Sequence, residues 1–292
     1  MVTESENILQ PHIYNNLYLL IFSEYTMSFL SGYRAHNSEV LGEGYGGKVY
    51  PGVRNSDGLP IAIKRIRKEN MRRTTLDGIP IEIALLKKAQ GIPGVIKFLD
   101  HFDHTEAHYL VMEKFGSCDL FQYISFNGGL EENVAKIIFK QVAEAMHKCF
   151  SREIAHGDIK DENILLDPNT FEVKIIDFGE GVMVENNTLR KFYGTMLHAP
   201  PEWFTTKRYA LEPTAVWSLG VLLYTIICGD YPFQNTEQTI KKPIWDFLAT
   251  KEESLQQLIR GCMTGDPLQR MTLAQIIQDP WLQAPQETHR NY

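Results

Sequence analysis

The chain has 292 residues, of which 43% are hydrophobic and 22% charged, and its 29 Lys and Arg against 36 Asp and Glu give a net charge of −7. This composition is that of a globular protein, and it excludes a disordered chain, a collagen-like fibre and a small disulfide scaffold. Phosphate-rich partners are bound by clustered Lys and Arg, so the acidic balance argues against nucleic acids and anionic membranes as general partners. A cationic partner or substrate stays possible.

The four cysteines, Cys118, Cys149, Cys228 and Cys262, are far apart and show no C-x-x-C spacing. This pattern disfavours a zinc site and predicts free thiols in a reducing compartment. We therefore expect a cytoplasmic protein, with the nucleus as a second location.

Residues 1–33 are predicted to form an N-terminal extension. Its apolar run, Leu17–Phe22, is too short to span a bilayer. Glu4 and Glu6 precede the run where a signal peptide would carry positive charge. We expect the extension to pack against the protein body or to be disordered, without stable membrane insertion. Docking to a membrane surface or to a partner is the alternative.

The next part of the chain has the pattern of β-strands with one helix. Short runs rich in Val and Ile alternate with turn clusters such as Asn55–Gly58. Ile79–Lys88 is predicted to be a helix with Pro80 in its first turn. Strand-like runs follow at Val95–Leu99 and His108–Met112.

After Gly116 the pattern becomes helical. Apolar residues recur every three to four positions from Val134 to Cys149, and Trp217–Cys228 is nearly all apolar. Shorter amphipathic helices are predicted at Leu255–Cys262 and Leu273–Ile277. The expected fold class is α+β, with a small antiparallel β-rich lobe that carries one main helix and a larger, mainly α-helical lobe.

A glycine-rich loop contains Gly42, Gly44 and Gly47. Glycines let a backbone approach phosphates closely, but the spacing G-x-G-x-x-G alone is weak evidence. A dinucleotide site would need a helix directly after it, whereas Lys48–Tyr50 is strand-like. The loop is therefore interpreted as a flap that covers a nucleotide.

The following strand carries Ala62 and Lys64 on one face, because strand side chains alternate. A small residue there can lie against a base while the lysine reaches phosphates. Glu82, in the next helix, is a candidate ion-pair partner for Lys64. A glutamate in a first helical turn is also common because it interacts with the helix dipole.

The densest group of reactive side chains is His156–Asn163, followed by Asp177-Phe178-Gly179. Phosphoryl transfer needs a carboxylate to orient or deprotonate the acceptor hydroxyl and oxygen ligands for Mg²⁺. Asp158 suits the first role, and Asn163 and Asp177 suit the second. Lys160 is placed to neutralise charge on the transferred phosphate.

Taken in order, the glycine loop, A-I-K, the helix glutamate, the catalytic loop, D-F-G and Pro200-Pro201-Glu202 resemble a eukaryotic protein kinase over residues 38–283. The closest resemblance within that family is to the Pim serine/threonine kinases. Four stretches carry it: Asp158–Leu165, Pro200–Trp203, Ala215–Gly220 and Cys228–Asp230.

The resemblance implies a bilobal protein-kinase domain at residues 34–283. The N-lobe would span 34–112, the hinge 113–116 and the C-lobe 117–283, with a tail at 284–292. It implies ATP and Mg²⁺ as cofactors and a monomeric enzyme. It further implies that His156 packs on Phe178 and that Arg270 pairs with Glu202.

The resemblance also implies a set of residues that bind ATP. They are Leu41, Gly42, Gly44, Gly47, Val49, Ala62, Lys64, Met112, Glu113, Phe115, Leu165 and Ile176. Asp158, Lys160, Lys64 and Glu82 would form the catalytic set.

Four positions depart from the family pattern. Gly157 replaces the arginine that usually meets an activation-loop phosphate, so we expect activity without phosphorylation of Thr188, Tyr193 or Thr195. Lys114 and Phe115 stand in a hinge without the Pim proline, the loop aromatic is displaced to Tyr45, and Ala215 replaces a helix aspartate, as it does in Pim kinases.

Carboxylates on elements that border the peptide groove of such kinases indicate a preference for basic protein segments with Arg or Lys upstream of Ser/Thr. They are Asp119, Glu162, Asp230 and Glu237, while Gln122 stands where Pim kinases have a further acid.

Two other functions remain open at this point. The motif H-G-D followed by Asn163 also occurs in small-molecule phosphotransferases, although Lys160 and Pro201–Trp203 favour a protein kinase. Gly157 and the irregular glycine loop are compatible with a pseudokinase scaffold, against which stand all the catalytic residues named above.

Overall fold

A computed structural model of the chain describes residues 32–36, 39–44, 46–184, 188–233, 235 and 250–284. The chain divides into two compact units. Unit 1 contains residues up to Arg72 together with Phe98–Lys114, and unit 2 contains Arg73–Lys97 and the chain from Phe115 onward. Residues 1–31 of the predicted extension, residues 285–292 of the predicted tail, Tyr45 and Glu237 lie outside the described residues.

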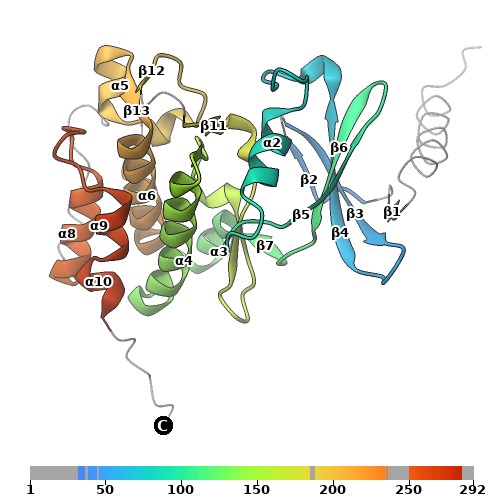
Figure 1. Ribbon diagram of the computed structural model, residues 1–292. Coiled ribbons are helices and arrows are strands. Elements are labelled where there is room, and N and C mark those ends of the chain that lie inside the picture. Colours follow the sequence, from blue (N-terminus) through green and yellow to red (C-terminus); the bar gives the residue numbers. More distant parts are fainter. Residues whose placement is uncertain are drawn as a thin grey trace, which may run out of the picture. The chain divides into compact units, whose positions relative to one another are not determined.

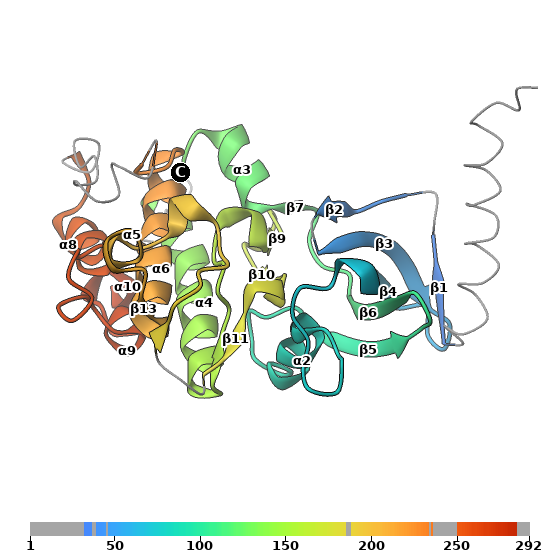
Figure 2. The same cartoon turned by 90° about the horizontal axis from the view of Figure 1, so that it is seen from above.

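Unit 1 is a six-stranded antiparallel sheet with strand order β1-β3-β4-β6-β5, and β2 pairs with β3 (Figures 1 and 2). The strands are β1 (Tyr33–Ala35), β2 (Gly42–Gly44), β3 (Gly47–Arg54), β4 (Pro60–Arg67), β5 (Phe98–Asp103) and β6 (Ala107–Glu113). A short 3₁₀ turn, η1 (Lys68–Asn70), follows β4.

The sheet is favoured by the β-branched and aromatic residues of β3, β4 and β6, which have high strand propensity. One face carries a compact core that includes Ile61, Ile63, Tyr109 and Val111. At the turn between β3 and β4, the Arg54 guanidinium donates to Asp57 Oδ1 at 3.0 Å.

Unit 2 is mainly helical. Its helices are α2 (Ile81–Lys88), α3 (Leu120–Asn127), α4 (Glu132–Ser151), α5 (Pro201–Thr206), α6 (Leu211–Cys228), α8 (Glu253–Cys262), α9 (Leu273–Ile277) and α10 (Pro280–Gln283). The shorter elements are β7 (Cys118–Asp119), β8 (Ile154–Ala155), η2 (Asp161–Asn163), β9 (Ile164–Leu166), β10 (Val173–Ile175), η3 (Phe178–Glu180), β11 (Val182–Met183), β12 (Thr188–Leu189), η4 (Met196–His198) and β13 (Tyr209–Ala210).

Helix α6 is the central helix of unit 2 and packs beside α4 and α8 (Figure 1). It is long and apolar enough to span a membrane, but 78% of that stretch is buried inside the protein. This is the environment of a core helix, with Trp217 stacked on Phe233 at 5.8 Å between ring centroids.

Local signals set several helix ends. Asp119 caps α3 by accepting a hydrogen bond from the Gln122 N–H at 2.7 Å, and Gly128 ends that helix with φ +69°. Thr272 and Gln275 form a capping box at α9.

Most predicted elements are present, and two differ from the prediction. The predicted strand Val95–Leu99 is displaced, because Val95 forms only a bridge to Ile175 in unit 2 and β5 begins at Phe98. The predicted helix Ile79–Lys88 begins at Ile81, after Pro80, which cannot donate a backbone hydrogen bond. Arg73–Lys97 belongs to unit 2 because α2 packs on η3 and β11. The sequence prediction placed these residues in the N-lobe.

All four cysteines are free, as predicted. Burial raises the pKa of the Cys149 and Cys228 thiols to about 12 and also raises the pKa of Cys118 and Cys262.

Candidate active site

In unit 1, one face of the sheet collects predicted ATP-binding residues. Register pairs Ala62 with Met112 and Lys64 with Val49. Directly opposed residues of an antiparallel pair project to the same face, and Ala62 and Lys64 share a face by alternation. These four side chains therefore lie on the face opposite the Ile61–Ile63 core.

The glycine loop forms the tight β2–β3 hairpin, in which Gly42 pairs with Val49 and Gly44 with Gly47. Gly47 has φ +129°, and a Cβ there would overlap the Arg65 carbonyl oxygen, so only glycine fits. Leu41 precedes the hairpin, and its N–H donates to the Val49 carbonyl oxygen at 2.9 Å.

Two hinge residues end unit 1. Glu113 ends β6 opposite Ile61, and the Lys114 N–H donates to the Pro60 carbonyl oxygen at 3.3 Å. The first hinge residue of unit 2 is Phe115, whose ring lies 5.4 Å from Lys174 Nζ. Because the Lys114 N–H has a partner in the sheet, the Phe115 N–H is the better placed of the two for adenine.

In unit 2, the Asp158 carboxylate is fixed by hydrogen bonds. Its Oδ1 accepts from the Thr195 N–H at 2.7 Å, and its Oδ2 accepts from Asn163 Nδ2 at 3.3 Å. Asn163 Nδ2 also donates to the Asp158 carbonyl oxygen at 2.8 Å. Asp158, Thr195 and Asn163 therefore form one hydrogen-bonded group.

Lys160 lies beside Asp158. Its Nζ is 3.0 Å from Thr195 Oγ1, 3.5 Å from Asp158 Oδ2 and 3.8 Å from Glu162 Oε1. A cation is thus held within reach of the carboxylate that would orient an acceptor hydroxyl. Sequence reasoning treated Thr195 only as a phosphorylation candidate and missed that it positions both side chains.

The metal-binding residues predicted from the sequence are brought together by the backbone. The Ile176 N–H, next to Asp177, donates to the Asn163 carbonyl oxygen at 2.9 Å. Asn163 directs its amide nitrogen to Asp158, which leaves its amide oxygen for a metal, and Asp177 has φ +61° and accepts from the Gly179 N–H at 3.2 Å.

These donors fit Mg²⁺, which binds one or two protein oxygen ligands together with substrate phosphates. Within the described residues, no group of three or more His, Cys, Asp or Glu is placed to hold a metal. A bound Mg²⁺ would therefore rely on Asn163, Asp177 and the phosphates of the nucleotide.

The His156 ring stabilises the loop that carries Asp158 by hydrogen bonds to backbone groups. Its Nδ1 accepts from the Asp158 N–H at 3.3 Å, so Nε2 carries the proton and donates to the Ile176 carbonyl oxygen at 2.9 Å. Burial lowers the pKa of His156 and keeps the ring neutral. Its ring contacts Phe178 at 4.6 Å between centroids, which confirms that expected contact.

The remaining predicted residues of unit 2 are placed as follows. Glu82 is buried on α2, which packs on η3, and its predicted partner Lys64 belongs to unit 1, so their ion pair stays a prediction. Leu165 lies in β9 and pairs with Lys174 and Asp119, and Ile176 directly follows β10.

Of the predicted peptide-binding carboxylates, Asp119 is engaged as the cap of α3. Asp230 is exposed and accepts from the Tyr231 N–H at 2.8 Å. Burial raises the pKa of Glu162, against the effect of Lys160. The sequence did not single out Asp161, which is buried and accepts a hydrogen bond from the Tyr231 hydroxyl at 2.9 Å.

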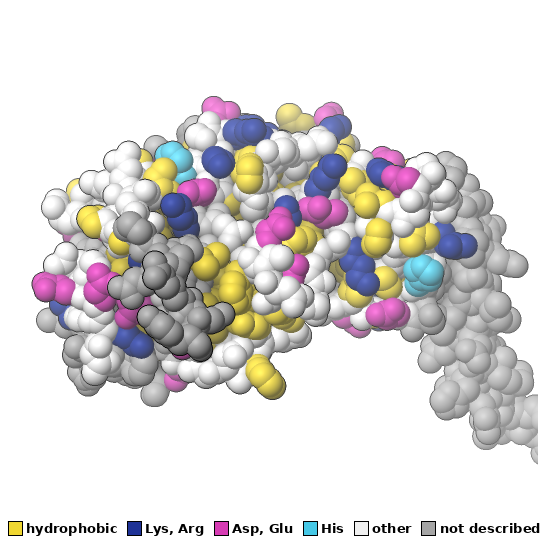
Figure 3. Space-filling view, turned by 90° about the horizontal axis from the view of Figure 1, so that it is seen from below, with side chains coloured by type: hydrophobic (Ala, Val, Ile, Leu, Met, Phe, Trp, Pro, Cys, Tyr) yellow, Lys and Arg dark blue, Asp and Glu magenta, His cyan; other side chains and the backbone are white. Residues whose placement is uncertain are grey.

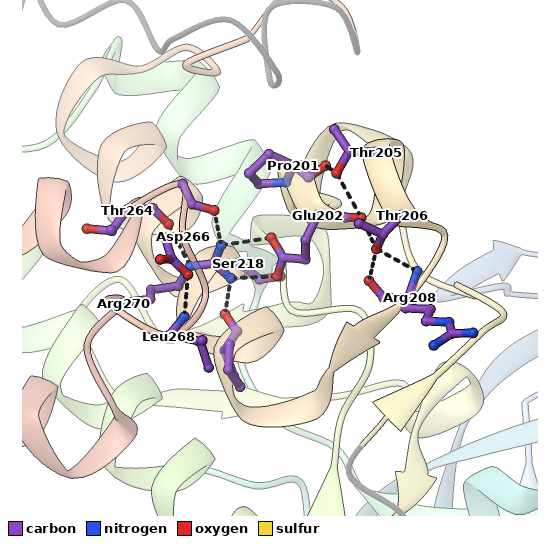
Figure 4. A network of polar contacts seen from close by, with 12 residues as sticks. Pro201, Glu202, Thr205, Thr206, Arg208, Ser218, Thr264, Asp266, Leu268 and Arg270 are labelled. Atoms are coloured by element: carbon purple, nitrogen blue, oxygen red, sulfur yellow. Dashed lines mark hydrogen bonds and ion pairs between the residues drawn. The ribbon is translucent and has the colours of Figure 1, made fainter.

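The predicted Glu202–Arg270 pair is confirmed (Figure 4). Arg270 donates to both carboxylate oxygens of Glu202 at 2.9 Å, and to the carbonyl oxygens of Pro213 at 2.8 Å and Thr264 at 2.9 Å. The Arg270 side chain is fully buried. We call the stretch from Asp177 to Glu202 the activation segment. Such bidentate, charge-assisted bonding fixes its end against α6.

Gly157, the departure before Asp158, has φ +83°, and a Cβ there would overlap the Glu180 carbonyl oxygen. A cavity of about 20 Å³ lies beside it, lined by residues that include Gly157, Thr214 and Ala215. Two of the departures from the family pattern, Gly157 and Ala215, thus border the same space.

The comparisons with known proteins agree with this geometry. Residues 35–282 match the family model described as protein kinase domain. The chain is 40% identical over 258 residues to the serine/threonine-protein kinase pim-2 of Danio rerio, covering 83% of each chain.

For two further relatives, the match covers a smaller share of the relative's own length. The chain is 36% identical over 276 residues to the serine/threonine-protein kinase prk-2 of Caenorhabditis elegans, covering 91% of this chain and 62% of that protein. It is also 36% identical over 262 residues to a PAS domain-containing serine/threonine-protein kinase of Mus musculus, covering 87% of this chain and 19% of that protein. The chain therefore belongs to the protein kinase domain family and is an ATP-dependent protein serine/threonine kinase similar to the Pim kinases.

Proposed function

We propose that this kinase transfers the γ-phosphate of Mg-ATP to Ser or Thr in protein segments with Arg or Lys upstream, and that it does so without activation-loop phosphorylation. The observation that carries the proposal is the fixed Asp158 carboxylate, held by Thr195 and Asn163 with Lys160 beside it.

In this proposal Asp158 orients the acceptor hydroxyl and takes its proton, and Lys160 stabilises the charge on the transferred phosphate. Asn163 and Asp177 hold Mg²⁺. In unit 1, the sheet face with Val49, Ala62, Lys64 and Met112 and the glycine loop bind the nucleotide.

The assay that tests catalysis compares the wild-type protein with Asp158→Asn. We expect turnover to fall by about 10³-fold or more while nucleotide binding is retained, because the amide cannot accept the proton. Retained phosphate transfer by Asp158→Asn would refute the role of Asp158, and transfer to small polyols instead of peptides would indicate a small-molecule phosphotransferase.

A preference for basic substrates is supported by Glu162 and Asp230. Glu162 lies in the catalytic loop, and Asp230 lies beyond the end of α6, next to Tyr231, whose hydroxyl donates to Asp161 of that loop. An arginine of a substrate peptide would neutralise these two carboxylates. We expect Glu162→Gln and Asp230→Asn each to raise KM for arginine-containing peptides by roughly tenfold, with little effect on kcat.

The matched control is Glu253→Gln, an exposed acid on α8, which should leave KM unchanged. A peptide with its arginines replaced by alanine should respond to none of the three substitutions. Equal effects of the substitutions on both peptides would refute direct recognition of arginine.

Independence from phosphorylation is supported by the contacts of the unmodified segment. Thr195 already bonds to Asp158 and Lys160, and Phe192, Trp203 and Tyr209 pack together with ring centroids 5.5 to 5.9 Å apart. Phosphatase-treated protein and the variants Thr188→Ala and Tyr193→Phe should keep full activity. Loss of activity on phosphatase treatment would refute this part of the proposal.

We also propose that the protein acts as a monomer in the cytoplasm, with the nucleus as a second location. Sedimentation of the purified chain and microscopy of a tagged chain test these two statements.

A further inference from the structure

A cluster of positive side chains lies at one end of the β12–β13 pair. Register pairs Thr188 with Ala210 and Leu189 with Tyr209. The two residues that follow β12 and the two that precede β13 are all Arg or Lys. We call Arg190, Lys191, Lys207 and Arg208 the basic cluster.

Among the residues that the structure describes, no carboxylate pairs with the basic cluster. All four residues are exposed, and in the part of the chain that the structure describes none of them forms an ion pair with a carboxylate. Four exposed positive charges close together, in a chain of net charge −7, therefore indicate a ligand that supplies negative charge.

Two members of the cluster are held in place by aromatic rings. Lys207 Nζ lies 5.1 Å from the Trp203 ring centroid, and Lys191 Nζ lies 4.8 Å from the Tyr193 ring centroid. The Tyr209 hydroxyl also donates to the Lys191 carbonyl oxygen at 3.0 Å. Lys207 has φ +54°, where glycine or asparagine is the usual residue, so a lysine is kept there at a conformational cost.

An apolar groove adjoins the cluster. It has a volume of about 580 Å³ and is lined by residues that include Pro201, Thr205, Arg208, Tyr209, Ala210 and Pro267. Figure 4 shows the Arg208 side chain directed away from the buried Glu202–Arg270 pair. The carboxylate of Glu202 is already neutralised by Arg270, so it does not offset the charge of Arg208.

We propose that the basic cluster and this groove form a docking site for an acidic segment of a partner protein, with an apolar side chain of that segment in the groove. The cations fit carboxylates, and the groove fits one or two apolar side chains. A short acidic segment engages only the four cations, whereas an extended polyanion such as a bilayer or nucleic acid would also meet the negative charge of the rest of the chain. On the face in Figure 3, acidic and basic side chains are interspersed.

The probe is a fluorescein-labelled peptide, Glu-Glu-Leu-Phe-Glu-Glu, which has no Ser, Thr or Tyr and so cannot be a substrate. Its binding is followed by fluorescence anisotropy with the full chain. We expect Arg190→Gln/Arg208→Gln to weaken binding roughly tenfold, because two exposed ion pairs are lost. The same peptide with Gly-Gly in place of Leu-Phe should also bind more weakly.

The matched control is Lys87→Gln/Lys148→Gln, which removes the same charge from exposed positions on α2 and α4. It should bind like the wild type. Both double variants should keep the wild-type melting temperature, since neither pair has a partner in the described fold.

Equal weakening by the two double variants would overturn the proposal in favour of general charge attraction. Undiminished binding of the Gly-Gly peptide would overturn the role of the groove. Cluster-dependent binding to vesicles of phosphatidylserine, stronger than to the peptide, would replace the acidic protein segment with a membrane and so overturn the proposed occupant.

Discussion

The two flanks of the activation segment in unit 2 are fixed in opposite ways. At the Glu202–Arg270 pair, side chains do the fixing: a buried guanidinium meets a carboxylate and backbone carbonyls (Figure 4). At Gly157, the contact is made by the backbone, which passes so close to the Glu180 carbonyl that no side chain fits. Gly194 approaches the Gly157 carbonyl equally closely.

Consecutive residues of helix α6 lie at both flanks. The Pro213 carbonyl accepts from Arg270, whereas Thr214 and Ala215 line the cavity beside Gly157. The difference teaches that one flank of this chain needs a residue without a side chain, whereas the other needs two charged side chains that meet.

The largest expected effect is at the charge pair. Arg270→Met leaves Glu202, which is 10% exposed, without its cation and removes a donor from the carbonyl oxygens of Pro213, Thr264 and Gly265. We expect a loss of about 3–5 kcal/mol in the free energy of unfolding, measured in urea. Arg54→Met removes a similar bidentate partner from exposed Asp57 and should have a much smaller effect. Similar losses in the two variants would contradict the role of burial.

The next effect is a pH dependence of the free energy of unfolding, caused by His198, which precedes Glu202 by four residues. Burial lowers the pKa of His198 from 6.5 to about 4, and neither of its ring nitrogens has a hydrogen-bond partner among the residues that the structure describes. The unfolded chain binds the proton more readily, so stability is full above about pH 6.5 and falls as the pH drops toward 4. The shift corresponds to about 2–3 kcal/mol at about pH 4.5.

Urea unfolding at about pH 7 and about pH 4.5 measures this loss. His198→Phe, which keeps a ring against Tyr231, should have a smaller pH-dependent loss than the wild type. An unchanged loss would assign the pH dependence to other groups, such as the buried His156.

A smaller effect is expected at the backbone flank. Gly157→Ala should cost at least about 2 kcal/mol in the free energy of unfolding, because the Cβ meets the Glu180 carbonyl and φ is +83°. Gly128→Ala is matched, since Gly128 has φ +69° but open space around it, and should cost only about 1 kcal/mol. Equal costs would show that only φ, and no close approach, requires glycine at position 157.

The smallest effect concerns the cavity. The Thr214 hydroxyl is buried without a partner, so Thr214→Val should stabilise the protein by up to about 1 kcal/mol. Thr225→Val, on the same helix, removes a hydroxyl that donates to the Val221 carbonyl at 3.0 Å and should destabilise by about the same amount. A destabilised Thr214→Val would indicate that a water in the cavity bonds the hydroxyl.

The hydrogen bonds between Asp158 and Asn163 are the kind of feature that a sequence can predict, because they are local. Asp158, Asn163 and Asp177 lie in short motifs, and the hydrogen bonds of Asn163 to Asp158 follow from a spacing of five residues. Apolar periodicity likewise predicted α4, α6 and α9, since each buries one continuous stripe or surface.

Features that join distant residues were harder to predict. Nothing in the sequence pairs Gly157 with Ala215 around one cavity, or shows that Arg190 follows one strand of a pair and Arg208 precedes the other, because both follow from how β12, β13 and α6 meet. The Glu202–Arg270 pair, 68 residues apart, was predicted only through the family resemblance. The displaced strand near Val95 shows the limit of apolar runs, which do not say which partner a strand pairs with.

The raised pKa values of all four thiols have a practical consequence for spectroscopy. Maleimides and iodoacetamides attack the thiolate, and at neutral pH almost none of Cys149 or Cys228 is ionised. A cysteine introduced at an exposed position would react far faster than Cys149 or Cys228. A dye or spin label can therefore be attached at such a position without first replacing these two residues.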